Sequence, residues 1–117
     1  MSTLTVTNIK ATGETASRAV SGVAAAWVYF STSVSTSIYS SFNVSSLTDN
    51  GTGNTDVNIS NAMISNTDIC LQGFSNNFQT HNSQPPTASS FNVYTSNASG
   101  TAGDGSRNHF LLHGDLA

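Results

Sequence analysis

Short, polar, uncharged side chains dominate this sequence and restrict what it can fold into. Ser, Thr and Asn supply 20, 15 and 13 of the 117 residues, whereas only 8% of the residues are charged. Thr favours strands, Ser and Asn favour turns, and none of the three is a strong helix former. The composition therefore predicts one small all-β domain.

Short runs of alternating apolar side chains predict the strands of this domain. They span residues 4–9, 23–30, 38–46, 57–59, 69–74, 90–95 and 108–113. The Asp-Asn-Gly-Thr-Gly sequence at residues 49–53 contains residues that tolerate positive φ, so it predicts a hairpin turn. Seven short strands without a convincing amphipathic helix are typical of an antiparallel β-sandwich.

The chain divides into an N-terminal arm with its linker, residues 1–22, and a β-sandwich domain, residues 23–117. The strand pattern at residues 4–9 has β-forming side chains on both faces, as expected of a strand docked on both sides. Residues 1–10 lack a charged leader followed by an apolar stretch, so we expect no secretory signal.

The strand predicted at residues 23–30 carries apolar side chains on both of its faces. Val28 and Phe30 alternate with Trp27 and Tyr29, so each face is expected to be at least half-buried. Because the chain has few surface charges, apolar surface such as Trp27 and Tyr29 is expected to be shared between copies of the chain.

The charge pattern excludes two classes of partner. The three cations, Lys10, Arg18 and Arg107, are scattered, so they cannot neutralise the run of phosphates that nucleic-acid binding requires or follow an anionic membrane surface. The longest apolar stretch, residues 19–30, is shorter than the ~20 residues that span a bilayer. We therefore expect neither nucleic-acid binding nor membrane insertion.

Cysteine and histidine do not predict a metal site or a cofactor. Cys70 is the only cysteine, which excludes an internal disulfide, and its apolar neighbours predict a small buried side chain. On a strand, His109, Leu111 and His113 share a face, but the two histidines are rooted roughly 13 Å apart, too far to share an ion within one chain. A ring of equivalent histidines around a trimer axis is the alternative; packed or solvated histidines are the simpler interpretation.

Catalytic patterns are also lacking. There is no G-x-S-x-G nucleophile elbow, and most of the six carboxylates lie beside Gly or Asn in predicted turns, where Asp acts as a turn former. We expect a protein that is not an enzyme.

One long loop, residues 75–89, stands apart from the strands. It contains Asn76, Asn77, Phe78 and His81. Long loops on a β scaffold are where binding residues are often displayed. The alternative is a surface crossover in which Phe78 packs into the core.

Five segments of the chain form a distinctive set: Ala-Trp-Val-Tyr-Phe at 26–30, Ser-Phe-Asn-Val-Ser-Ser-Leu-Thr-Asp-Asn-Gly-Thr-Gly at 41–53, Val-Asn-Ile at 57–59, Ala-Met at 62–63 and Gly-Asp-Leu-Ala at 114–117. Together they resemble a small domain common in tailed bacteriophages, especially those of cyanobacteria and marine bacteria. The resemblance covers most of the chain from about residue 16. It implies a non-enzymatic, β-rich, homotrimeric component of a tail fibre or another virion appendage.

The resemblance does not identify a receptor, so the location and the partners of such a virion protein are a further hypothesis. A virion protein of this kind is assembled in the host cytoplasm and released by lysis, and its N-terminal arm would attach it to the particle. The loops would then contact a host surface glycan, with Phe78 or Tyr94 stacking on sugar rings and Asn76, Asn77 and His81 forming hydrogen bonds. Trp27 and Tyr29 would lie in the trimer interface. The alternative is a capsid decoration (head fibre) or baseplate protein whose only partners are other virion proteins.

Overall fold

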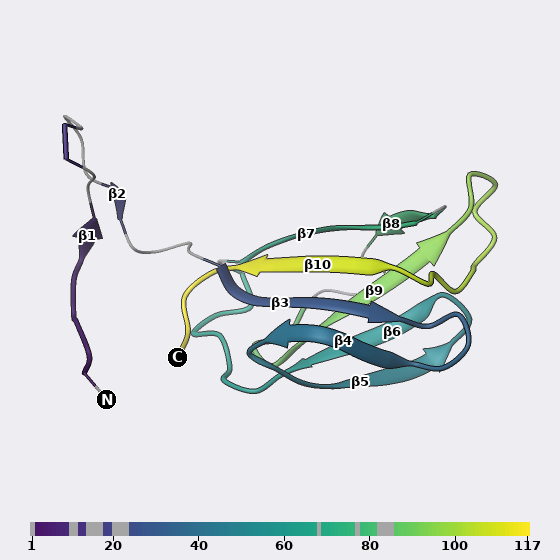
Figure 1. Ribbon diagram of the computed structural model, residues 1–117, viewed down its shortest axis with the longest axis horizontal. Helices are drawn as coiled ribbons and strands as arrows, with labels where there is room; N and C mark the ends of the chain where they lie inside the picture. The colour runs from purple at the N-terminus through teal and green to yellow at the C-terminus, as the bar shows by residue number, and fades with distance from the viewer. Residues whose placement is uncertain are drawn as a thin grey trace.

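The computed structural model describes residues 2–9, 12–13, 18–19, 24–67, 69–76, 78–81 and 86–117. Two antiparallel four-stranded sheets form the body of the molecule, which confirms the predicted all-β sandwich (Figure 1). The first sheet has the order β4 (Ser37–Phe42), β3 (Ala24–Ser31), β10 (Asn108–His113), β7 (Cys70–Ser75). The second has the order β5 (Val44–Gly51), β6 (Asn54–Ile59), β9 (Ser90–Ser96), β8 (Gln79–His81).

The core lies between the two sheets and follows the alternation of the strands. In β3, Val28 and Phe30 are buried, and in β10 the same is true of Phe110. The second sheet contributes Phe91, whose ring centroid lies 6.5 Å from that of Phe110. The remaining members of this buried cluster are Ala25, Ala26, Val57, Ile59, Met63, Val93 and Leu112. Burial of this apolar surface, worth roughly 25 cal/mol per Å², stabilises a sandwich that has no disulfide.

One predicted strand, residues 38–46, is in fact two strands in different sheets. The chain turns at Asn43, whose φ of 55° lies in the left-handed region. The Asn43 side chain holds this corner: its Nδ2 donates to the carbonyl of Ala25 at 3.0 Å, and its Oδ1 accepts from the amide of Asn61 at 2.8 Å. Asn adopts positive φ more readily than most residues, so a strand pattern without Gly or Pro can still contain a corner.

Two other strand predictions need correction. Cys70 lies in β7 as predicted, but its side chain is exposed rather than buried, because β7 is the edge strand of its sheet and Cys70 faces away from the core. The predicted loop at residues 75–89 contains a strand, β8, which pairs with β9. The predicted hairpin at residues 49–53 is confirmed by the pairing of β5 with β6.

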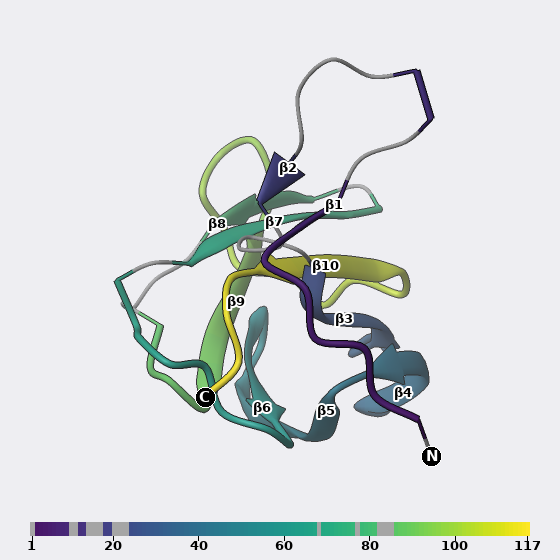
Figure 2. The same cartoon turned by 90° about the vertical axis from the view of Figure 1, so that its left-hand side faces the viewer.

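The N-terminal segment forms a small ribbon outside both sheets. Its two strands, β1 (Asn8–Ile9) and β2 (Arg18–Ala19), pair with each other. Figure 1 shows them beyond one end of the sandwich, and Figure 2, viewed from that end, shows them in front of it. The expectation that residues 4–9 form a strand docked on both sides was wrong. Leu4 is 84% exposed and strand structure begins only at Asn8.

Candidate functional site

Four loops gather at the end of the sandwich opposite the β1–β2 ribbon and the C-terminus (Figure 1). They contain residues 32–36, residues 52–53, residues 76 and 78, and residues 97–107, and we call them the distal loops. Hydrogen bonds connect these loops: the backbone amide of Thr32 donates to the carbonyl of Gly105 at 3.0 Å. The amide of Gly53 donates to the Asp104 carboxylate at 2.6 Å. The distal loops therefore form one connected surface.

Two of the residues predicted to bind a ligand, Asn76 and Phe78, make contacts within the distal loops that stabilise their conformation. Asn76 Oδ1 accepts from the amide of Arg107 at 2.8 Å, and Asn76 Nδ2 donates to Ser106 Oγ at 3.1 Å. The Phe78 ring is half-buried and lies against Gly103, at a place where any side chain on Gly103 would collide with it. Their role in ligand binding stays a prediction.

The other predicted binding residues lie elsewhere or outside the described residues. His81 and Tyr94 are backbone partners in the pairing of β8 with β9, so the structure brings these two positions together on the second sheet. Tyr94 is half-buried. Asn77 lies outside the described residues, and so does the side chain of His81. The four described positions are thus divided between the distal loops and the β8–β9 pair.

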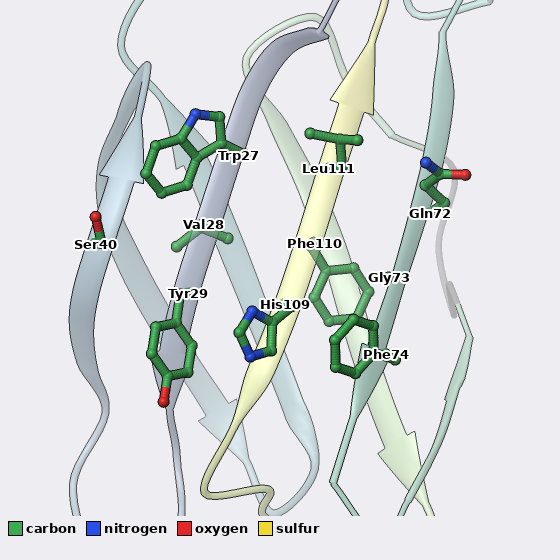
Figure 3. A pocket seen from close by; sticks show the side chains of 10 residues that line it. All are labelled: Trp27, Val28, Tyr29, Ser40, Gln72, Gly73, Phe74, His109, Phe110 and Leu111. Atoms are coloured by element: carbon green, nitrogen blue, oxygen red, sulfur yellow. The ribbon is translucent and has the colours of Figure 1, made fainter.

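A second candidate surface is the outer face of the β4-β3-β10-β7 sheet, where aromatic rings form a row across the strands. Tyr29, His109 and Phe74 are register partners on β3, β10 and β7. The Tyr29 and His109 rings stack with centroids 4.2 Å apart and planes 9° apart, and His109 stacks on Phe74 at 4.7 Å and 19°. Tyr39 extends the row, with its ring centroid 4.8 Å from that of Tyr29. Figure 3 shows three of these rings side by side.

A parallel row lies one step along the strands. Phe42, Trp27, Leu111 and Gln72 are register partners on β4, β3, β10 and β7. Between the two rows lies an open hollow of about 560 Å³. We call the outward apolar side chains of this sheet the aromatic face: Trp27, Tyr29, Tyr39, Phe42, Phe74, His109 and Leu111. The predicted interface residues Trp27 and Tyr29 both belong to it.

The strands that carry the aromatic face contain no carboxylate, lysine or arginine. Gly73 allows the edge strand β7 to pack closely over β10, because a Cβ at this position would collide with the Phe110 ring and with the carbonyl oxygen of His109. Without that side chain, Phe110 packs beneath β7, and Phe74 is presented on the outside.

The described residues of the aromatic face form no candidate metal site. His109, Leu111 and His113 share the outer face of β10, as the alternation predicts, and all three are half-buried. Among the described residues, no three His, Cys, Asp or Glu side chains come together as a metal site. The described residues also contain no helix long and apolar enough to span a bilayer.

Sequence reasoning selected Trp27 and Tyr29 but not the other rings of the aromatic face. The alternation of β10 placed His109 and Leu111 on one face, which was the available signal. Phe74 and Tyr39 could not be joined to them without the register of four strands that lie far apart in sequence. In comparisons with known proteins, no family model, curated protein or solved structure matches this chain.

Proposed function

We propose that this chain is a component of a bacteriophage tail fibre or similar virion appendage, which presents its distal loops to a glycan on the host surface. The observation that carries the proposal is the placement of the β1–β2 ribbon and the distal loops at opposite ends of the sandwich (Figure 1). A segment that attaches the domain and a surface that contacts the host need this separation. The resemblance of residues 26–30 and 41–53 to a phage domain supports the same role.

The distal loops have the chemistry that a neutral ligand needs. Their tips are exposed at residues 33–35 and 97–101, where Ser, Thr and Asn offer hydrogen-bond donors and acceptors. Val34 is 97% exposed, and Arg107 is exposed in the same group of loops. The internal hydrogen bonds of Asn76 and Asp104 hold these loops in place, so little conformational entropy is lost when a ligand binds.

Weak contacts of this kind become useful when several copies act together. A single carbohydrate contact on exposed loops has a low affinity. Several copies held on one appendage bind one host surface at a high effective concentration, which raises the overall affinity. The role is that of a binding and structural protein, and the proposal includes no chemical step.

A cryo-EM reconstruction of the particle that carries this chain tests the proposal. We expect density for the sandwich on a tail appendage, with residues 97–101 directed away from the particle. Density on the capsid shell or within the baseplate would overturn it and favour a protein whose only partners are other virion proteins.

Binding of the purified chain to host cells gives an independent test. We expect the wild type to bind, and Val34→Glu together with Arg107→Ala to bind less, because both positions are exposed at the distal end. Ile64→Glu, at an exposed position outside the distal loops, is the control and should bind like the wild type. Equal binding by the wild type, the Val34→Glu/Arg107→Ala double variant and the Ile64→Glu control would count against recognition by this surface.

A further inference from the structure

The hollow in the aromatic face has the size and the lining of a ligand-binding site. Its volume of about 560 Å³ lies within the range of about 300–1,000 Å³ that small-molecule pockets occupy. It is lined mainly by apolar side chains, among them Trp27, Phe74 and Leu111, and it is open to water. An open apolar hollow suits a ligand that has an apolar surface on one side and polar groups elsewhere, because those polar groups stay in water.

The hollow runs across the strands rather than along them. In three of the strands one side chain lies on each side of it (Figure 3): Trp27 and Tyr29 on β3, Leu111 and His109 on β10, and Gln72 and Phe74 on β7. With Ser40 of β4, the lining spans four strands, which is three interstrand spacings of ~4.8 Å or about 14 Å. This length exceeds that of a single six-membered ring, so the hollow accommodates a short chain of rings.

The rings of the hollow are held in place without a ligand. His109 stacks between Tyr29 and Phe74, with ring centroids 4.2 and 4.7 Å away. Val28 and Phe110, which also line the hollow, belong to the buried core. A ligand therefore binds to a surface that is already ordered, and little conformational entropy of the protein is lost.

The polar groups of the hollow lie on its two outermost strands. Ser40 is on β4 and Gln72 is on β7, the edge strands of this sheet, and both residues are exposed. A serine hydroxyl and a glutamine amide can each donate and accept hydrogen bonds. A ligand with hydroxyl groups around an apolar surface matches this distribution.

The charges of the sheet select among such ligands. The four strands contain no Asp, Glu, Lys or Arg, so an ionised ligand would lose part of its hydration without gaining a counter-charge. A neutral pyranose with equatorial hydroxyls has the required shape: its faces are made of C–H groups and its rim of hydroxyls. The C–H groups carry a small positive charge, which complements the negative faces of aromatic rings.

We propose that the hollow of the aromatic face binds a neutral oligosaccharide, whose sugar rings lie on the aromatic side chains and whose hydroxyls reach Ser40 and Gln72. This site lies on the outer face of a sheet and not on the distal loops. The inference therefore goes beyond the proposed function and does not depend on it. Loss of host-cell binding with retained oligosaccharide binding would reject only the proposed function.

Titration of the purified full chain with cellohexaose and chitohexaose tests the site, because the sugar rings of both carry equatorial substituents. Trp27 is the single tryptophan and lines the hollow, so its indole N–H gives one NMR signal that reports on this place alone. We expect a saturable shift of that signal and a blue shift of the Trp27 fluorescence with at least one of the two probes. Hexagalacturonic acid, which is ionised, should bind about tenfold or more weakly.

Two variants and a control locate the binding. Phe74→Ala and Gln72→Ala remove exposed side chains from the hollow, so circular dichroism should show the wild-type fold. Phe74→Ala should weaken binding about tenfold, because one aromatic contact is lost. Gln72→Ala should weaken it about threefold to tenfold, because a hydrogen-bonding group is lost. Val34→Ala, at a 97% exposed position of the distal loops, should bind like the wild type.

Four results would each overturn the proposal. The first is an unchanged Trp27 indole signal with both neutral probes, and the second is equal binding of hexagalacturonic acid. The third is wild-type affinity in both hollow variants. The fourth is an oligomer in native mass spectrometry that Phe74→Glu dissociates, because a second copy of the chain would then occupy this face.

Discussion

Asn43 gives the sharpest test of how this sequence turns a single strand pattern into two strands of different sheets. Its side chain forms three bonds to the backbone: Nδ2 donates to the carbonyls of Ala25 and Asn61 at 3.0 and 3.1 Å, and Oδ1 accepts from the amide of Asn61 at 2.8 Å. Its backbone has a φ of 55°. These two contributions can be separated by comparing two substitutions.

Asn43→Gly removes the three bonds but keeps a residue that adopts positive φ freely. At roughly 0.5–1 kcal/mol for each partly exposed bond, the free energy of unfolding should fall by about 2 kcal/mol. Asn43→Ala removes the same bonds and introduces a residue that adopts positive φ less readily than Asn, which adds about 1 kcal/mol, for a total of about 3 kcal/mol.

Urea unfolding at a fixed protein concentration measures both changes, with the fluorescence of Trp27, the single tryptophan, as the signal. The expected order of stability is wild type, Asn43→Gly, Asn43→Ala. A Gly variant as stable as the wild type would show that the side-chain bonds do not hold the corner. Equal stability of the two variants would show that the backbone conformation is not a source of strain.

Three further predictions concern packing in the core and the loss of folding stability at acid pH. Gly73→Ala places a methyl group against Phe110 and should lower the free energy of unfolding by about 1–3 kcal/mol; an unchanged melting temperature would contradict this. Phe91→Ala empties a buried ring position and should cost about 3–5 kcal/mol in urea unfolding, and a loss below about 1 kcal/mol would contradict it. The Gly51 amide and a threonine hydroxyl lower the pKa of Asp49. The stability that the Asp49 carboxylate contributes is therefore present above the ordinary aspartate pKa and is lost as the pH falls through the lowered pKa. An ordinary aspartate midpoint in an NMR titration of this carboxyl would refute the prediction.

Alternation predicted the β-class and most of the strands because a sandwich buries one face of each strand. It placed Phe30 and Trp27 on opposite faces of their strand correctly, and the glycines at residues 51 and 53 marked the hairpin. It missed the corner at Asn43 because that residue replaces the Gly or Pro that normally marks a break. It misplaced Cys70 because apolar neighbours do not reveal that a strand lies at a sheet edge.

The candidate surfaces depended on pairing that the sequence does not display. Asn76 and Arg107 are 31 residues apart, and their hydrogen bond exists only because β7 and β10 are neighbours. The Tyr29, His109 and Phe74 row likewise requires three strands from separate parts of the chain in one register. Periodicity reports which face a side chain occupies, but not which side chains lie next to it.

The outer face of the second sheet restricts how copies of this sandwich can associate. There Asn92 Nδ2 donates to Asn54 Oδ1 and to Asp56 Oδ1, both at 2.7 Å. Covering this face would remove the Asp56 carboxylate from water, at a cost of roughly several kcal/mol without a compensating cation. Covering the aromatic face removes no carboxylate, lysine or arginine from water and gains roughly 25 cal/mol per Å² of apolar surface. If copies of this sandwich associate, the orientation with the aromatic face inward and the amide-rich face in water therefore has the lower cost.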